Sequence, residues 1–233
     1  MRTLIVLQGR LSNYFIVQNI IQIYKDIKND VIISTWVNED TRLIDILKEN
    51  GFNILLNELP EYLGINNCNL QTISTQKGIF NFLESDYTHV LKMRTDMIPR
   101  NLDYTSYSVN IFIDILKSIS ITDLVFLCWF DKYDKDYLCD FFSFGPIDKS
   151  YKFWNVFQKL DDNYSPEHFL TYMYTGLDDP KYHEIKNIFK FSINELEKNN
   201  IKLIRTNPEG NNFGLDQVYA YLHITQDVLK KYN

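Results

Sequence analysis

The first 56 residues alternate between short apolar runs and longer segments with helical spacing, and this alternation restricts the fold more than any other feature. Apolar runs typical of buried strands occur at Thr3–Leu7, Val31–Trp36 and Phe52–Leu56. Between them lie two segments with helical spacing, and Gly51 follows the second as a helix-terminating glycine. Strands and helices at this spacing predict βαβ units. We therefore expect an α/β fold with a mostly parallel central sheet flanked by helices.

Polar residues follow three of the expected strands. They are Gln8, Gly9 and Arg10 after the first strand, and Ser34, Thr35 and Trp36 at the end of the second. A further strand within Tyr87–Asp96 ends in Lys92, Arg94 and Asp96, and Pro99 is expected to stop it. Since ligands of open α/β sheets bind at the carboxyl ends of the strands, we expect a site there. A carboxylate beside two cations suits a metal-bridged nucleotide diphosphate, and it is equally consistent with a solvated ion pair.

The remaining residues predict more strands and helices within a single domain. Strands are expected at about 124–129, 139–144 and 202–205, and helices at about 74–84, 106–118, 148–160, 166–174 and 182–199. The charged segment 131–136 is expected to form a loop or a hairpin tip, and 216–223 is compatible with helix or strand. The C-terminal third is thus expected to be mostly helical.

Composition narrows the class of protein. The net charge of −6 argues against general nucleic-acid binding, which usually leaves a basic footprint. The three cysteines show no metal-binding spacing and favour a reducing compartment. No apolar run approaches the roughly 18 residues of a membrane helix, and the run Leu4–Leu7 is too short for a signal peptide. We therefore expect a soluble, cytoplasmic protein without a membrane span, and the oligomeric state stays open.

Several pieces of the chain, in order, resemble the WavE-type lipopolysaccharide-synthesis glycosyltransferases. These pieces are Gln8–Gly9, Ile33–Trp36, Asn69–Thr75 with Gly78, Leu91–Asp96, Asp140 with Phe144–Gly145, and Pro166–Leu170. The resemblance implies a GT-A-like nucleotide-binding sandwich that transfers a sugar from a nucleotide-sugar, with a UDP-sugar favoured, to a glycan acceptor. It also divides the single domain into a nucleotide-binding half, residues 1–100, and an acceptor-binding half, residues 101–233.

The resemblance further implies a donor site with a divalent metal, Mn²⁺ or Mg²⁺. GT-A enzymes commonly carry an Asp-x-Asp motif, and here Arg94 stands in place of its first acid. Asp96 remains as a metal ligand and His223 is a candidate late ligand, while Arg94 can bind phosphate directly through its bidentate fork. The implied donor-binding residues are Gln8, Gly9, Arg10, Ser34, Thr35, Trp36, Gln71, Ser74, Lys77, Lys92, Arg94 and Asp96.

Asp140 and Glu167 are the candidates for a catalytic base. An inverting transferase needs a carboxylate to take the proton of the acceptor hydroxyl. Asp140 is expected to open an apolar strand, where an unpaired carboxylate is costly. Glu167 follows Pro166 at an expected helix N-terminus, where a carboxylate also interacts favourably with the helix dipole. Asp216 is a third, weaker candidate.

The sequence leaves two other functions open. A nucleotidyltransferase would also use an α/β sheet, a metal and acidic residues, but it prefers a glycine-rich basic loop after the first strand, of which Gln8–Leu11 is a poor version. A catalytically inactive nucleotide- or glycan-binding module would be consistent with Arg94 in place of an acid. Pyrophosphate release from a nucleoside triphosphate would indicate the former, and donor binding without transfer the latter.

Overall fold

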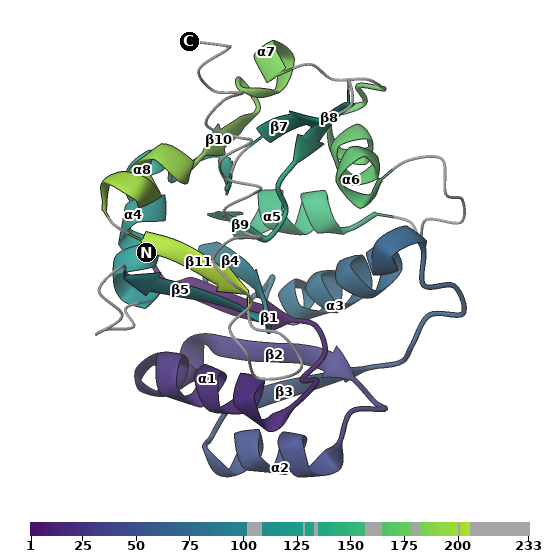
Figure 1. Cartoon of the computed structure of the whole chain (residues 1–233), viewed down its shortest axis with the longest axis vertical. Helices are drawn as coiled ribbons and strands as arrows, with labels where there is room; N and C mark the ends of the chain where they lie inside the picture. The colour runs from purple at the N-terminus through teal and green to yellow at the C-terminus, as the bar shows by residue number, and fades with distance from the viewer. Residues whose placement is uncertain are drawn as a thin grey trace.

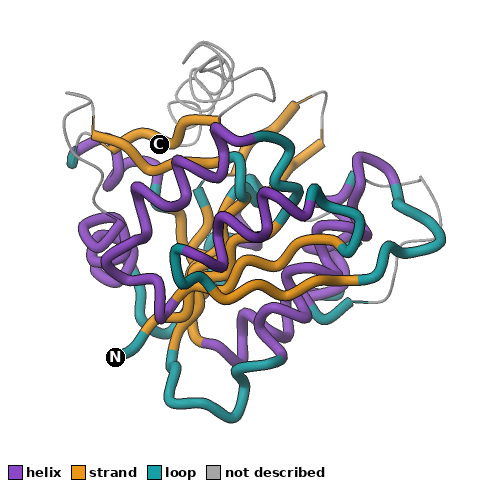
Figure 2. Tube along the Cα trace, turned by 90° about the horizontal axis from the view of Figure 1, so that it is seen from below, coloured by secondary structure: helices purple, strands orange, loops and turns teal. Residues whose placement is uncertain are grey.

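A seven-stranded sheet forms the centre of the computed structural model, which describes residues 1–101, 109–127, 129–132, 135–156, 165–178, 182–199 and 201–205 (Figures 1 and 2). The strand order is β10-β6-β9-β4-β1-β2-β3. The strands are β1 Thr3–Gln8, β2 Val31–Trp36, β3 Asn53–Asn57, β4 His89–Arg94, β6 Leu124–Phe126, β9 Phe142–Pro146 and β10 Phe189–Phe191. All of them run in one direction except β9, which is antiparallel to β4 and β6. The predicted α/β fold with a mostly parallel sheet is therefore confirmed.

Helices cover both faces of this sheet. One core contains residues of α1 Tyr14–Tyr24, α2 Thr41–Glu49, α4 Val109–Ile119 and α8 Ile193–Lys198. The other contains residues of α3 Cys68–Phe80, α5 Ile147–Trp154, α6 Pro166–Thr175 and α7 Tyr182–Ile185. Along β1, Ile5 and Leu7 face the first core, and Leu4 and Val6 the second. A strand covered on both sides has to be apolar throughout, which explains the continuous hydrophobic runs of the sequence.

Two small antiparallel pairs complete the described strands. β5 Met97–Asn101 pairs with β11 Ile201–Arg205, and β7 Trp129–Lys132 forms a hairpin with β8 Lys135–Leu138. The expectation that Pro99 stops the preceding strand was wrong, because β4 ends at Arg94 and Pro99 lies inside β5 opposite Leu203. A two-stranded ribbon consists of edge strands, where a missing N–H is tolerated. The hairpin agrees with the predicted hairpin tip at 131–136.

Tertiary contacts override several expected helix limits. Short 3-10 helices occupy Lys25–Asp30 and Ile65–Asn67, and α3 begins at Cys68, so Ser74 lies inside that helix. The single helix expected over 182–199 was wrong, because β10 interrupts it. Phe189 and Phe191 pair in parallel with β6. This pairing gives β6 backbone hydrogen bonds that a helix at the same place would not make. The expected element at 216–223 lies outside the described residues. No helix in the described part of the chain has the length and apolar character needed to cross a membrane.

Helix α3 packs directly against β1 because one of its residues is a glycine. A Cβ atom at Gly78 would lie 2.7 Å from Cγ1 of Val6 and 3.4 Å from Cβ of Ser34. A larger residue would therefore push the helix away from the sheet. This close contact sets the distance between α3 and the strands β1 and β2 (Figure 1).

The strand order reverses between β1 and β4. The chain proceeds outward from β1 through β2 to β3, and then returns to the other side of β1 as β4. Such a reversal opens a crevice at the carboxyl ends of the strands, where α/β proteins bind ligands. Gln8 and Arg94 are paired at this point. Since β9 is antiparallel, its beginning, and with it Asp140, reaches the same edge.

Candidate active site

The loops after β1 and β4 are held together by main-chain and hydroxyl hydrogen bonds. The N–H of Thr95 donates to the carbonyl of Gln8 at 2.9 Å, and its hydroxyl donates to the carbonyl of Arg10 at 2.7 Å. Gly9 has a φ of +128°, and a Cβ atom there would lie 3.0 Å from the Thr95 hydroxyl oxygen. Glycine is therefore required for this turn. The predicted residues Gln8 and Gly9 form a rigid part of the crevice rim.

Arg94 and Asp96 form a bidentate ion pair at this rim. Nε and one terminal nitrogen of Arg94 each lie 2.7 Å from an oxygen of Asp96. Burial disfavours the charged guanidinium, but the hydrogen bonds to Asp96 outweigh this effect and raise the pKa of Arg94. Both side chains are partly buried, so the pair is shielded from water. The predicted diphosphate site thus carries a guanidinium that is already oriented by its neighbour.

A second group of polar side chains gathers beside this pair. The Lys92 ammonium group donates to the main-chain carbonyl of Asp140 at 2.9 Å, and Nε2 of Gln71 donates to Oδ2 of Asp140 at 2.6 Å. Asp140 lies two residues before β9 and is 6% exposed. Lys92 is fully buried, and desolvation lowers its pKa to about 8, although the negative charge of Asp140 acts to raise it. The structure therefore brings Gln71, Lys92 and Asp140 together from α3, β4 and the segment before β9.

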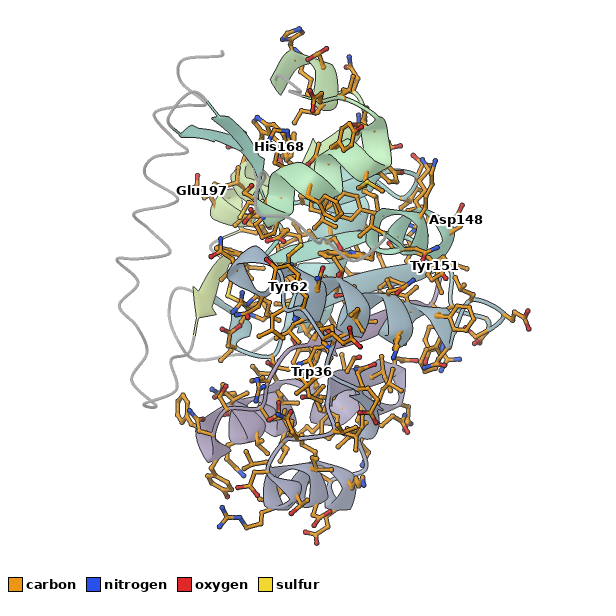
Figure 3. The ribbon with its side chains drawn as sticks, turned by 90° about the vertical axis from the view of Figure 1, so that its right-hand side faces the viewer. Trp36, Tyr62, Asp148, Tyr151, His168 and Glu197 are labelled. Atoms are coloured by element: carbon orange, nitrogen blue, oxygen red, sulfur yellow. The ribbon has the colours of Figure 1, made fainter. Side chains whose placement is uncertain are left out.

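Glu167 adds a second carboxylate to this group. It lies in the first turn of α6, whose N-cap Ser165 accepts a hydrogen bond from the N–H of His168, the neighbour of Glu167 marked in Figure 3. Desolvation and then the negative charge of Asp140 raise the pKa of Glu167 to about 7. A carboxyl group with a pKa near neutrality exchanges protons readily under physiological conditions. Asp140 and Glu167, both predicted as catalytic, therefore lie within electrostatic reach of each other.

The described residues do not by themselves form a metal site. They contain no group of three His, Cys, Asp or Glu side chains able to hold a metal ion. Asp96 is the predicted ligand, and both of its oxygens accept hydrogen bonds from Arg94. The other predicted ligand, His223, lies outside the described residues, as does Asp216. The use of Mn²⁺ or Mg²⁺ stays a prediction.

Several of the predicted donor-binding residues are buried in the core instead of lining the crevice. Ser34, Thr35 and Ser74 are fully buried, and Trp36 is 1% exposed within the body of the molecule (Figure 3). The hydroxyl of Ser34 donates to the carbonyl of Ser74 and accepts from the amide of Asn57, so it joins α3 to β2 and β3. Lys77 is exposed on α3. The geometry gives Ser34 and Ser74 structural contacts, and their donor-binding role remains a prediction.

We expect Ser34→Ala to lower the free energy of unfolding by about 1–3 kcal/mol, because it removes the two buried hydrogen bonds that the Ser34 hydroxyl makes. Thr35→Val is the matched control, since the buried Thr35 hydroxyl has no hydrogen-bond partner among the residues that the structure describes and valine keeps its shape. Urea denaturation of both variants measures the difference. Equal losses in the two variants would contradict the structural role of Ser34, and a weaker nucleotide affinity with unchanged stability would favour donor binding.

A cleft of about 520 Å³ lies between the loops that follow β1 and β2. Its lining includes Arg10, Tyr14, Glu39 and Arg42. Glu39 is largely buried, with Oε2 accepting from the N–H of Leu11 at 3.2 Å and Oε1 lacking a partner in the described chain. Sequence reasoning missed Glu39, because an acidic residue in Asn38-Glu-Asp40 reads as part of a helix start. Its position three residues after the end of β2 was the available signal.

Comparison with known proteins supports the fold. No model of a known protein family matches the sequence, and no curated protein matches it. A putative glucose-1-phosphate thymidylyltransferase from Bacillus anthracis has a similar structure, with a TM-score of 0.51 and 10% identity over 95% of this chain and 94% of the other. Weaker matches include 4-diphosphocytidyl-2C-methyl-D-erythritol synthase from Anaerococcus prevotii, with a TM-score of 0.44 and 10% identity over 81% of this chain and 84% of the other. Core-mannan synthase A from Aspergillus fumigatus gives a TM-score of 0.37 and 8% identity over 82% and 71%.

The fold is GT-A-like, as the resemblance implied. A fold does not by itself determine a reaction, so the fold alone leaves the reaction open. The finer resemblance to the WavE-type family stays a prediction, because no family model matches.

Proposed function

We propose that this protein is a glycosyltransferase that moves a sugar from a nucleotide-sugar to a hydroxyl group of a glycan. The observation that carries the proposal is the pair of carboxylates, in which burial and then the charge of Asp140 raise the pKa of Glu167 to about 7. A sugar hydroxyl must lose its proton as it attacks, and a base with a pKa near neutrality is suited to accept it. Nucleotidyl transfer to a sugar phosphate has less need of such a base, because the attacking phosphate is already ionised at neutral pH.

In the proposed reaction, Glu167 takes the proton of the acceptor hydroxyl. The hydroxyl oxygen forms a bond to the anomeric carbon of the donor sugar, and the bond from that carbon to the diphosphate breaks. The diphosphate leaves with the electron pair, and the partly buried Arg94 would bind its negative charge. Residues 1–100 would hold the nucleotide and the remaining residues the acceptor. A divalent ion, if bound, would neutralise the diphosphate.

The cleft between the loops after β1 and β2 is the proposed site of the nucleoside. It lies at the same sheet edge as Arg94, because Gln8, the last residue of β1, pairs with Ser34, two residues before the end of β2. Arg10 is exposed at this cleft and has no ion-pair partner in the described chain. The unpartnered Oε1 of Glu39 is placed to accept a hydrogen bond from a ribose hydroxyl.

The test is a thermal-shift screen with UDP-, GDP-, CMP- and dTDP-sugars, with and without Mn²⁺, followed by a transfer assay. A donor that binds the folded state raises the melting temperature by mass action. We expect stabilisation by at least one nucleotide-sugar, a UDP-sugar first, and sugar transfer to a glycan hydroxyl. Pyrophosphate release from a nucleoside triphosphate plus a sugar phosphate, without sugar transfer, would overturn the proposal in favour of nucleotidyl transfer.

We expect Arg10→Ala to weaken binding of the nucleoside diphosphate about tenfold, which corresponds to about 1.4 kcal/mol for the loss of one charge-assisted contact. Isothermal titration calorimetry of UDP with the wild type and the variant measures the change. Lys48→Ala is the control, because Lys48 is an exposed cation in the last turn of α2, away from the cleft lining. Equal affinities of the Arg10 variant and the wild type would contradict the placement of the nucleotide.

A further inference from the structure

Lys92 is buried inside the molecule, whereas a cation that binds the donor has to be accessible at the crevice. It belongs to β4 and is fully buried, on the face of the sheet that also carries Val90 and packs against α5. Arg94, two residues later, is the first cation of this strand with exposed atoms. A side chain without exposed surface cannot contact a phosphate in this conformation. The sequence-based role of Lys92 in donor binding therefore lacks a geometric basis.

The surroundings of Lys92 hold its ammonium group in one place. Nζ lies 4.5 Å from the ring centroid of Trp154, and Trp154 in turn donates through Nε1 to the hydroxyl of Ser143 at 3.0 Å. Ser143 is the residue of β9 that pairs with Lys92. An unpaired buried ammonium group is strongly unfavourable, whereas an apolar side chain would fill such a space at no electrostatic cost. The chain thus keeps a costly charge at a position next to Asp140.

Asp140 is held by hydrogen bonds to its main chain and to its side chain. Lys92 donates to its main-chain carbonyl at 2.9 Å, and Gln71 donates to its Oδ2 at 2.6 Å. No hydrogen bond within the described chain involves Oδ1 of Asp140. We propose that Lys92 is the positioning residue of this site, which fixes Asp140 from behind so that its carboxylate acts on Glu167. This inference rests on the proposed glycosyltransferase function.

The charge of Lys92 also reaches Glu167. Desolvation and Asp140 raise the pKa of Glu167 to about 7, and Lys92 acts in the opposite direction. The titratable groups that act on Lys92 are Asp140, Arg94, Asp96 and Cys139, and Trp154 covers it from α5. Removing the ammonium group therefore leaves two carboxylates without their shared cation. Glu167 should then become harder to ionise.

Lys92→Met tests the role, because methionine fills a similar space next to Trp154 without a charge. We expect kcat to fall about 10- to 100-fold, the KM for the donor to stay unchanged, and the pKa of Glu167 in a carboxyl ¹³C NMR titration to rise above the wild-type value. Lys48→Met, on the surface of α2, is the control and should change none of these.

Gln71→Ala is the second variant, and it removes the hydrogen bond to the carboxylate of Asp140. It is expected to lower kcat without raising the donor KM. It keeps the proposal testable if Lys92→Met does not fold. A raised donor KM with unchanged kcat in either variant would overturn the proposal in favour of donor binding. An unchanged kcat together with an unchanged Glu167 titration would overturn it in favour of a packing role. If the wild type transfers no sugar, the proposed function fails, while the titration, which needs no turnover, still tests Lys92.

Discussion

Replacing Glu167 by glutamine is expected to lower the rate of sugar transfer by about 10²- to 10⁴-fold, which is the usual contribution of a general base. Glutamine keeps the shape of the side chain but cannot accept the proton of the acceptor hydroxyl. The acidic limb of the pH–rate profile, expected near pH 7 from the raised pKa of Glu167, should disappear in the variant. Steady-state rates between pH 5 and 9 measure both effects.

The Asp140→Asn variant distinguishes the role of Asp140 from that of Glu167. Because the Asp140 charge helps to raise the pKa of Glu167, this variant should keep part of its activity, and its acidic limb should move below pH 7. If Asp140→Asn abolishes transfer while Glu167→Gln retains it with an unchanged profile, the base is Asp140 and the assignment to Glu167 is wrong.

The same Glu167→Gln variant is expected to be more stable than the wild type at pH 8, and the difference should shrink as the pH falls to 5. Burial raises the pKa of Glu167 from 4.5 to about 7, so the folded state favours the protonated form. That contribution to stability is complete below pH 4.5 and is lost as the pH rises through 7. At roughly 1.4 kcal/mol per pKa unit, the loss reaches about 3 kcal/mol, and glutamine avoids it.

Melting temperatures of the wild type and the variant across pH 5–8 test this difference. Glu49→Gln, at the exposed end of α2, is the control and should show no such trend. A variant that is less stable at pH 8 than at pH 5, relative to the wild type, would contradict the buried position of the carboxyl group.

The parallel half of the fold could be predicted because each strand is locally recognisable. The strands β1 and β2 are covered by helices on both faces, so their apolar runs are continuous and end where polar residues begin. Gly51 marks the end of α2 by its positive φ of +81°. By contrast, the strand β10 could not be predicted, because Phe189 and Phe191 become strand residues only through pairing with β6.

The members of the candidate site were each named from the sequence, but their arrangement was not. Gln71, Asp140 and Glu167 were each candidates, yet nothing in the sequence shows that they meet, since they are separated by 69 and 27 positions. They meet because β9 runs against its neighbours, and a short apolar run does not reveal its direction. Lys92 was expected at an accessible strand end, and its burial depends on Trp154, which lies 62 positions later.

The glycine contact between α3 and β1 has a consequence for altering this protein. Gln71 lies seven residues, or roughly 10 Å along the helix, before Gly78. A rigid helix that is lifted at Gly78 tilts or shifts along its whole length, and the 2.6 Å bond from Gln71 to Asp140 leaves little room for such a shift. The tolerance of the site to sequence change is thus set partly by a residue that touches none of its polar groups, and position 78 is a poor choice for helix-stabilising alanine substitution.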